Sequence, residues 1–335
     1  MAAILGPQNI RTRILEDQDV VRDLDHFRDI TSVVIREDTH ARFQVDLIGL
    51  SPIIANTIRR IILDDVPTMA IDTVVMYENT SIIPDEVLSH RLGLVPINVD
   101  PRLFEYHKDT ETITERNAIV FQLKITAPMA TTASAKLDLT QRWFHVYSRD
   151  LKWVPIGTQP TWLTDVMPLD PDILLLKLAP GQTVDCELYC HKGIGRTHAK
   201  FQPAATAWYT MKPRIKLFSK ALLADTDFET LKRRLHTICP VGIFTGINTL
   251  EDIEEFDYKV NVDHCTLCRE CINAFVQPDK EPGVQVELIK SHLRFTIESC
   301  SWYSAKDIFY EALTVMQQKA ALLKASLNNE TLVEE

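Results

Sequence analysis

The alternation of apolar and polar positions predicts a chain that mixes strands with helices. Residues 43–47 alternate strictly between apolar and polar side chains, which is typical of a half-buried strand. Residues 52–64 instead carry isoleucines at helical spacing, with Ser51 as the expected N-cap and Pro52 at the first helical position. Residues 71–77 are expected to form a further strand.

The middle of the chain, residues 84–213, has the character of a separate and mostly β domain. Residues 119–125 alternate cleanly, and no long helical pattern interrupts this part. Prolines divide it at positions 128, 155, 160, 168, 171, 180 and 203. Pro fixes φ and donates no backbone hydrogen bond, so this spacing favours short strands joined by loops.

Helical periodicity returns in the last third of the chain. We expect a helix over 228–238, a β-hairpin over 284–297 with its turn at Ser291-His292, and a long helix that Ser304 and Asp307 begin. Apolar residues recur along that last helix at alternating steps of four and three. This heptad seam suits packing against a helix of the same chain or of another chain. Its members are Phe309, Leu313, Met316, Ala320, Leu323 and Leu327.

Composition narrows the class of protein. A chain of 335 residues with 45% hydrophobic and 24% charged residues is long enough for two or three globular domains. The net charge of −10 disfavours binding of nucleic acid over the whole surface, because phosphate contacts need clustered Lys and Arg. The first residues show no signal-peptide pattern, so we expect an intracellular protein with reduced or metal-bound cysteines.

Four cysteines form the strongest candidate for a metal site. Cys265, Cys268 and Cys271 have the C-x2-C-x2-C spacing of ferredoxins, and Cys239, followed by proline, supplies a remote fourth thiolate. The pattern predicts a [4Fe–4S] cluster, with zinc as the alternative metal. A third alternative, that the cysteines bind no metal, stays open at this point.

The sequence lacks the common catalytic motifs. It contains no phosphate-binding loop, nucleophile elbow, zinc-protease motif or dinucleotide-binding fingerprint. We therefore predict no catalytic residue. A tight turn is expected to account for Gly193 and Gly195.

A long ordered series of residues resembles the signature of the α-like subunits of cellular RNA polymerases. It runs from Asn56-Thr-Ile-Arg-Arg-Ile61 through Val66-Pro67 and Asp85-Glu86 to His90-Arg91-Leu-Gly-Leu94-Val-Pro96. Gly193-Ile-Gly195 with His198-Ala-Lys200-Phe201 matches the middle domain of the same family, in which Trp is usual at the place of Phe201.

Other segments are similar to one branch of that family, the large α-like subunit shared by eukaryotic RNA polymerases I and III. These segments are 145–152, 171–174 and 178–181. The cluster cysteines depart from that branch toward the archaeal pattern. An archaeal-type subunit and a single-cluster iron–sulfur electron carrier are therefore the alternatives, together with a zinc-dependent interaction module.

The resemblance implies an α+β fold with a discontinuous dimerisation domain made of a sheet and two packed helices. A mostly β domain would be inserted in it, and a small ferredoxin-like cysteine subdomain would follow. The implied parts are an acidic lead-in over 1–30, the dimerisation domain over 31–85, 213–224 and 283–335, the inserted domain over 86–212, and the cysteine subdomain over 225–282.

The resemblance also implies a function without catalysis. Such a subunit is an assembly platform in the nucleus, including the nucleolus. It heterodimerises with a small α-like subunit and docks the large catalytic subunits, with no membrane contact and little direct contact to nucleic acid. The expected partner-binding residues are Ile54, Ile58, Ile61, Phe309, Leu313, Met316 and Leu323. Those expected to dock the large subunits are Arg59, Arg60, His90, Arg91, His198 and Lys200.

Overall fold

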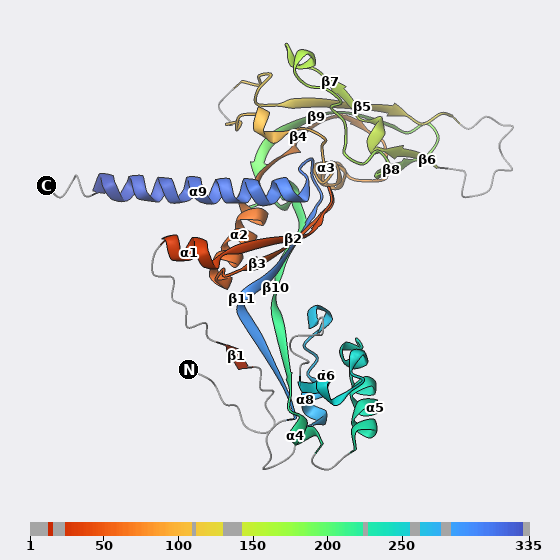
Figure 1. The fold of residues 1–335 in the computed structure, drawn as a ribbon. Helices are drawn as coiled ribbons and strands as arrows, with labels where there is room; N and C mark the ends of the chain where they lie inside the picture. The colour runs from red at the N-terminus through yellow and green to blue at the C-terminus, as the bar shows by residue number, and fades with distance from the viewer. Residues whose placement is uncertain are drawn as a thin grey trace, which may run out of the picture. The chain divides into compact units, whose positions relative to one another are not determined.

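A computed structural model shows a mixed α+β chain, as predicted (Figure 1). It describes residues 13–15, 24–108, 112–129, 143–223, 227–254, 262–275 and 283–330. Of the predicted acidic lead-in, strand β1 (Arg13–Leu15) and helix α1 (Leu24–Ile30) are described, and its other residues lie outside these ranges. None of the helices in the described part has the length and hydropathy of a membrane-spanning segment.

The chain divides into two compact units, each built from segments far apart in the sequence. Unit 1 comprises residues 1–36, 44–56 and 209–295. Unit 2 comprises residues 37–43, 57–208 and 296–335.

A five-stranded sheet contributes most of its residues to unit 1. The strand order is β1-β11-β3-β2, and β10 also pairs with β11. Strand β1 lies parallel to β11, with Ile14 opposite Leu288. The other strands are β2 (Ser32–Asp38), β3 (Arg42–Ile48), β10 (Ala204–Leu217) and β11 (Val284–Ser299).

Strand β11 corrects the prediction of a hairpin over 284–297, because it runs without a turn through Ser291 and His292. The backbone oxygen of Ser291 accepts a hydrogen bond from Gly49 N at 2.7 Å. The side chain of His292 lies 3.6 Å from the carboxylate of Asp46. Both residues therefore belong to the strand, and the hydrogen bond to Ser291 joins β11 to a neighbouring segment.

One charged residue of β3 departs from the alternating burial that is expected of a half-buried strand. Asp46 is fully buried, yet strict alternation would direct it to solvent. Its carboxylate accepts hydrogen bonds from Arg294 Nε at 2.8 Å and from Arg36 Nε at 2.8 Å. Arg294 also donates to Asp263 at 2.8 Å, so the buried carboxylate is part of an ion-pair network.

The rest of unit 1 packs short helices on the sheet. Its core contains Leu231, Leu235, Phe244, Ile272 and Val286. Helix α5 confirms the periodicity predicted over 228–238, and Asp227 caps it by accepting from Thr230 N at 3.2 Å. The helices are α4 (Ser219–Leu222), α5 (Phe228–Ile238), η7 (Ile243–Gly246), α6 (Leu250–Glu254), η8 (Val262–His264) and α8 (Glu270–Ala274).

Unit 2 contains a four-stranded sheet in the order β4-β9-β5-β7. Strands β4 and β5 both pair antiparallel with β9, so β9 lies between them. Irregular register in β4 occurs between Ile71 and Thr73 and between Met76 and Glu78. The strands are β4 (Pro67–Asn79), β5 (Ile119–Thr126), β7 (Lys152–Val154) and β9 (Thr183–Ile194).

The core of unit 2 lies against this sheet, and a smaller sheet of β6 and β8 belongs to the same unit. Cys186 and Cys190 are fully buried in that core. Burial raises the pKa of Cys186 to about 12. The remaining short elements are β6 (Phe144–Tyr147), β8 (Leu174–Leu178), η1 (Pro101–Leu103), η4 (Ser148–Asp150), η5 (Gln159–Thr161) and η6 (Ala199–Phe201).

Helix α3 (Asp85–Gly93) was not expected in the middle region. Its apolar pattern is weak because it rests on two buried leucines, Leu88 and Leu92, which lie one turn apart. The neighbouring Val87 is about half exposed and does not extend the pattern. Two leucines four positions apart cannot be told from a strand or loop by spacing alone. Burial against the core of unit 2 decides for the helix.

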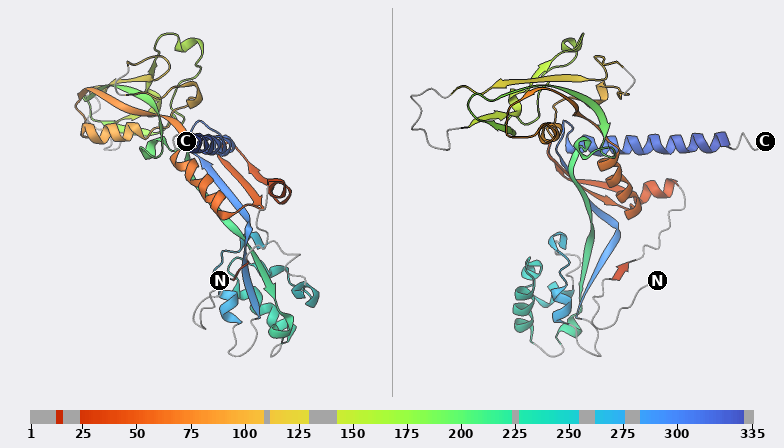
Figure 2. Two further views of the ribbon diagram at one scale, coloured as in Figure 1. Left: turned by 90° about the vertical axis from the view of Figure 1, so that its left-hand side faces the viewer. Right: turned by 180° about the vertical axis from the view of Figure 1, so that it is seen from behind.

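Helices α2 (Pro52–Asp64) and α9 (Ala305–Glu330) confirm the helices predicted over 52–64 and after Ser304. In α2, Ala55, Ile58, Ile61 and Ile62 are buried. Figures 1 and 2 show α9 (blue) as one straight helix whose last turns extend beyond the β4-β9-β5-β7 sheet. The two helices thus differ, because α2 buries one face along its length whereas α9 is exposed throughout 320–327.

Candidate partner-binding surface

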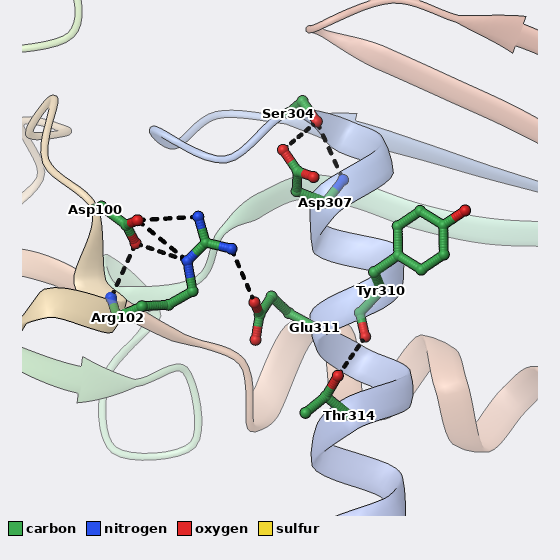
Figure 3. A network of polar contacts seen from close by, with 7 residues as sticks. All are labelled: Asp100, Arg102, Ser304, Asp307, Tyr310, Glu311 and Thr314. Atoms are coloured by element: carbon green, nitrogen blue, oxygen red, sulfur yellow. Dashed lines mark hydrogen bonds and ion pairs between the residues drawn. The ribbon is translucent and has the colours of Figure 1, made fainter.

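The start of α9 is held in place by a capping serine. Ser304 Oγ accepts a hydrogen bond from Asp307 N at 3.1 Å and donates one to the Asp307 carboxylate at 2.7 Å (Figure 3). These two bonds confirm Ser304 and Asp307 as the helix start. A capping hydroxyl of this kind satisfies one of the free N–H groups of the first turn.

One turn further along α9, Glu311 is linked to Arg102 of η1. The Arg102 guanidinium binds Asp100 at 2.9 Å and reaches Glu311 at 3.4 Å (Figure 3). The hydrogen bond with Asp100 raises the pKa of Arg102 further above its usual range. The same guanidinium carbon lies 5.4 Å from the ring centre of Trp302. The first turns of α9 are therefore anchored to η1 within the same unit.

Further along α9, Lys319 anchors the helix to the segment that follows α2. Its ammonium pairs with Asp65 just after α2, and Arg196 pairs with the same carboxylate at 2.7 Å. Beyond Lys319 every residue from 320 to 327 is exposed. Leu322 and Leu323 are 68% and 67% exposed, which is unusual for adjacent leucines of one helix.

The predicted partner-binding residues fall into a buried group and an accessible group. Ile58 and Ile61 are buried inside this chain, Ile54 is half-buried, and Phe309 is buried against Phe43 with ring centres 5.8 Å apart. Leu313 and Leu323 are exposed, and Met316 is half-buried. Residues that sequence reasoning did not include are Leu322 and Tyr310, both exposed on α9.

The predicted docking residues also differ in whether their side chains bind other residues of this chain. Arg91 donates hydrogen bonds to the backbone oxygens of Leu174 at 2.7 Å and Leu175 at 3.0 Å, which ties α3 to β8. Lys200 Nζ pairs with Asp72 at 2.6 Å and is largely buried. These two cations have structural partners, and the sequence alone does not reveal them.

The remaining docking residues lie at the surface. Arg60 is exposed and Arg59 is half-buried on α2. The rings of His90 and His198 lie 6.3 Å apart, and His198 Nδ1 accepts a hydrogen bond from Lys200 N at 3.1 Å. The structure therefore brings His90, His198 and Lys200 together.

Close packing constrains both glycines of the signature, and a turn contains only Gly195. A Cβ on Gly195 would lie 1.9 Å from the backbone oxygen of Leu63, and one on Gly193 would lie 2.6 Å from the Phe201 ring. Gly193 is in strand β9, and neither glycine has a positive φ. The turn interpretation therefore holds for Gly195, which lies in a turn where Thr197 N donates to the backbone oxygen of Ile194 at 3.0 Å. It was wrong for Gly193, where the constraint comes from the Phe201 ring.

The four predicted metal ligands line one small apolar pocket in unit 1 with Phe244 and Val286. Cys271 is buried, Cys239 and Cys265 are half-buried, and Cys268 is exposed. Burial raises the pKa of Cys265 and brings that of Cys271 to about 11. Cys239 Sγ accepts a hydrogen bond from Ile243 N at 3.4 Å.

Comparison with known proteins gives the family. The model of the RNA polymerase Rpb3/RpoA insert domain matches residues 70–208. The chain is 37% identical over 288 residues to the DNA-directed RNA polymerases I and III subunit RPAC1 of Saccharomyces cerevisiae, covering 83% of this chain and 82% of that protein. The chain belongs to the Rpb3/RpoA family of α-like RNA polymerase subunits. The predicted resemblance is therefore confirmed.

Two other relatives locate the chain within this family. The RNA polymerases I and III subunit rpac1 of Dictyostelium discoideum is 34% identical, covering 91% of this chain and 84% of its own length. Subunit Rpo3 of the archaeon Methanosarcina mazei is 29% identical, covering 87% of this chain and 95% of its own length. The α-like chain is thus more similar to the polymerase I and III subunits than to the archaeal one.

The prediction of a [4Fe–4S] cluster, with zinc as the alternative, is wrong. Within the described ranges no three or more His, Cys, Asp or Glu side chains are grouped so that they could hold a metal ion. The relatives are named as polymerase subunits and not as iron–sulfur proteins. The spacing misled because it fixes how near the thiols are in the chain, whereas ligation needs all four deprotonated and converging.

Proposed function

We propose that this α-like chain is the large α-like subunit shared by RNA polymerases I and III, and that it acts as an assembly platform without catalytic chemistry. Similarity to RPAC1 over more than four fifths of the chain carries this proposal. The relatives bear the name of a subunit of DNA-directed RNA polymerases I and III, so transcription in the nucleus and nucleolus is the setting proposed here.

The first proposed contact is a heterodimer with a small α-like subunit through α9. Its support is the run of exposed residues after Lys319, in which Leu322 and Leu323 are about two-thirds exposed. Leu313 and Met316 would continue this surface toward the anchored end of the helix. We propose that Ile54, Ile58, Ile61 and Phe309 support it from within the chain, as their burial favours.

The second proposed contact docks the large catalytic subunits on the signature residues. Arg59, Arg60, His90 and His198 are the members with accessible surface. Arg91 and Lys200 would position these residues through their bonds to β8 and to Asp72. The net charge of −10 agrees with a platform that makes little direct contact with nucleic acid.

The proposed domain organisation follows the family. A discontinuous dimerisation domain would comprise residues 31–85, 213–224 and 283–335, and the β domain inserted over 86–212 overlaps the matched insert-domain model. Residues 225–282 would form a small cysteine-containing subdomain, whose described core packs around Leu235 and Phe244.

A tagged pull-down from native extract tests the proposal, with the bound chains identified by mass spectrometry. We expect one small α-like subunit together with the large subunits of both polymerases I and III. Recovery with subunits of a single polymerase would contradict the shared role, and recovery of the chain alone would contradict the platform role altogether.

A further inference from the structure

A single carboxylate in unit 2 holds two elements that carry different proposed contacts. Asp65 follows the end of α2, and its side chain is 9% exposed. One of its oxygens, Oδ1, accepts a hydrogen bond from Arg196 at 2.7 Å, and the other, Oδ2, accepts one from Lys319 of α9. Arg196 and Lys319 lie 131 and 254 residues away along the chain. Asp65 therefore joins three parts of the unit that are far apart in the sequence.

The end of α2 also holds the turn that contains Arg196. Backbone carbonyls at a helix C-terminus lack partners within the helix and carry a partial negative charge, which favours nearby cations. The backbone oxygen of Asp64 accepts a hydrogen bond from Arg196 N at 2.9 Å. A Cβ on Gly195 would lie 1.9 Å from the backbone oxygen of Leu63. The turn is thus packed directly on the last carbonyls of α2, next to the carboxylate.

This turn leads to two of the proposed docking residues. His198 lies two residues after Arg196, and its Nδ1 accepts a hydrogen bond from Lys200 N at 3.1 Å. Lys200 Nζ has a separate anchor, because it pairs with Asp72 at 2.6 Å. A shift of the turn would therefore move His198 first, since it is the docking residue nearest to the pair of Arg196 with Asp65.

On α9 the same carboxylate acts beyond the part of the helix that is packed in the core. Ala312 is fully buried, Val315 and Lys319 are half-buried, and residues 320–327 are exposed. At a rise of about 1.5 Å per residue, Leu323 lies about 16 Å beyond Ala312 but about 6 Å beyond Lys319. A tilt of about 10° at Ala312 would move Leu323 by about 3 Å. The pair at Lys319 therefore restrains the direction in which the exposed leucines are presented.

The two cations do not need this carboxylate to stay solvated. The side chain of Arg196 is 62% exposed and that of Lys319 is 44% exposed. Removing the carboxylate therefore leaves no buried unpaired charge, and loss of an ion pair with an exposed partner changes stability little. We expect Asp65 to matter more for the orientation of these elements than for the stability of the chain.

We infer that Asp65 is a positioning residue for both proposed contact surfaces, the end of α9 that binds the small α-like subunit and the turn before His198 that docks a large subunit. The inference rests on the proposed function, because both contacts belong to it. Asp65 acts on the first surface through Lys319 and on the second through Arg196. Variants of these three residues should therefore differ in the subunit that they lose.

Purification of tagged variants from native extract tests this inference, with the bound subunits quantified by mass spectrometry. The extract is diluted until the parent complex is partly dissociated, so that the amounts respond to affinity. Two ratios are measured, the small subunit per tagged chain and the large subunits per small subunit. The second ratio does not include a loss of the small subunit itself.

The three variants have distinct expected results. Asp65→Asn keeps the shape of the side chain without its charge, and both ratios should fall about 3- to 10-fold, the range for loss of a partly exposed ion pair. Lys319→Met should lower the first ratio and leave the second unchanged. Arg196→Met should lower the second ratio and leave the first unchanged.

Controls separate positioning from folding. Asp185→Asn removes a matched carboxylate of β9, which is 16% exposed and pairs with Lys124 at 2.6 Å, and should leave both ratios unchanged. Lys319→Arg keeps a cation on α9 and should retain the small subunit. The urea midpoint of every variant should stay close to that of the parent chain. If Asp65→Asn lowered the midpoint and all three variants lowered both ratios together, the role would be merely structural, which overturns the inference.

The remaining outcomes distinguish failure of the inference from failure of the proposed function. Unchanged ratios for Asp65→Asn, with both kinds of subunit bound to the parent chain, would overturn the inference and leave the proposed function in place. Equal losses of both ratios for Lys319→Met and Arg196→Met would also overturn it, because neither residue would then serve one surface. If the parent chain recovers neither kind of subunit, the proposed function fails together with the inference.

Discussion

Replacing Leu323 by Asp should remove binding of the small α-like partner without unfolding the chain. Leu323 is 67% exposed and lies beyond Lys319, which anchors α9 to Asp65. The substitution therefore changes a surface position in the isolated chain. Surface changes of this kind usually alter the free energy of unfolding by less than about 0.5 kcal/mol.

The effect on the heterodimer is expected to be much larger. Full burial of a leucine side chain contributes about 1.5–3 kcal/mol, and roughly two thirds of Leu323 remains to be buried by a partner. The lost apolar contact is then about 1–2 kcal/mol. An unpaired carboxylate in the same contact adds a desolvation penalty of several kcal/mol. A total loss above about 3 kcal/mol corresponds to more than 100-fold weaker binding.

Co-expression with the small partner provides the assay, with the ratio of the two chains measured after tagged purification. Ile82→Asp is the matched control, because Ile82 is 70% exposed and lies after β4, away from α9. We expect near-equal amounts of both chains for the parent chain and the control, and loss of the partner for Leu323→Asp. Circular dichroism and the urea midpoint should agree among all three chains.

Retention of the small partner by Leu323→Asp at the level of the control would refute this placement of the interface. A second variant separates the interface from the core. Ile58 is 3% exposed, so Ile58→Asp should lower the stability of the chain itself. If Leu323→Asp instead lowered the urea midpoint as much as Ile58→Asp, the assumption that the end of α9 is free of tertiary packing would be wrong.

Three further predictions concern stability. Burial raises the pKa of Asp46, but hydrogen bonds from Arg294 and Arg36 outweigh this effect and bring it from 3.8 to about 2. The carboxylate therefore contributes about 2 kcal/mol above pH 4 that is lost as the pH falls toward 2, and urea unfolding of Asp46→Asn should lack this part of the pH dependence. Gly195→Ala should cost about 1–3 kcal/mol in thermal or urea unfolding through the clash with a backbone oxygen, whereas Gly246→Ala, with open space around its Cβ, should change little. Cys268→Ser should change the unfolding free energy by less than about 0.5 kcal/mol and leave assembly with polymerase intact, because Cys268 is exposed; a loss of several kcal/mol would revive a ligand role.

The sequence by itself determined the family and the main elements. The strand at 43–47, the helix at 52–64 and the long last helix all appear where periodicity predicts them. Their signals are local, because alternation, helical spacing and a capping serine act within a few residues. The signature from Asn56 to Pro96 led to the family in the same way, as an ordered pattern along the chain.

Tertiary structure alone decided what these residues contact. Asp46 is buried because arginines from two other strands meet it, although alternation directs it to solvent. Ser291 and His292 continue β11 because a neighbouring segment pairs with the strand there, with Gly49 N donating to the backbone oxygen of Ser291. The cysteine spacing could not reveal how exposed each thiol is or whether the four converge. In each case the residue that decides the outcome lies far away in the sequence. It comes within contact distance, and its interaction contributes to the free energy of folding, only once the chain has folded.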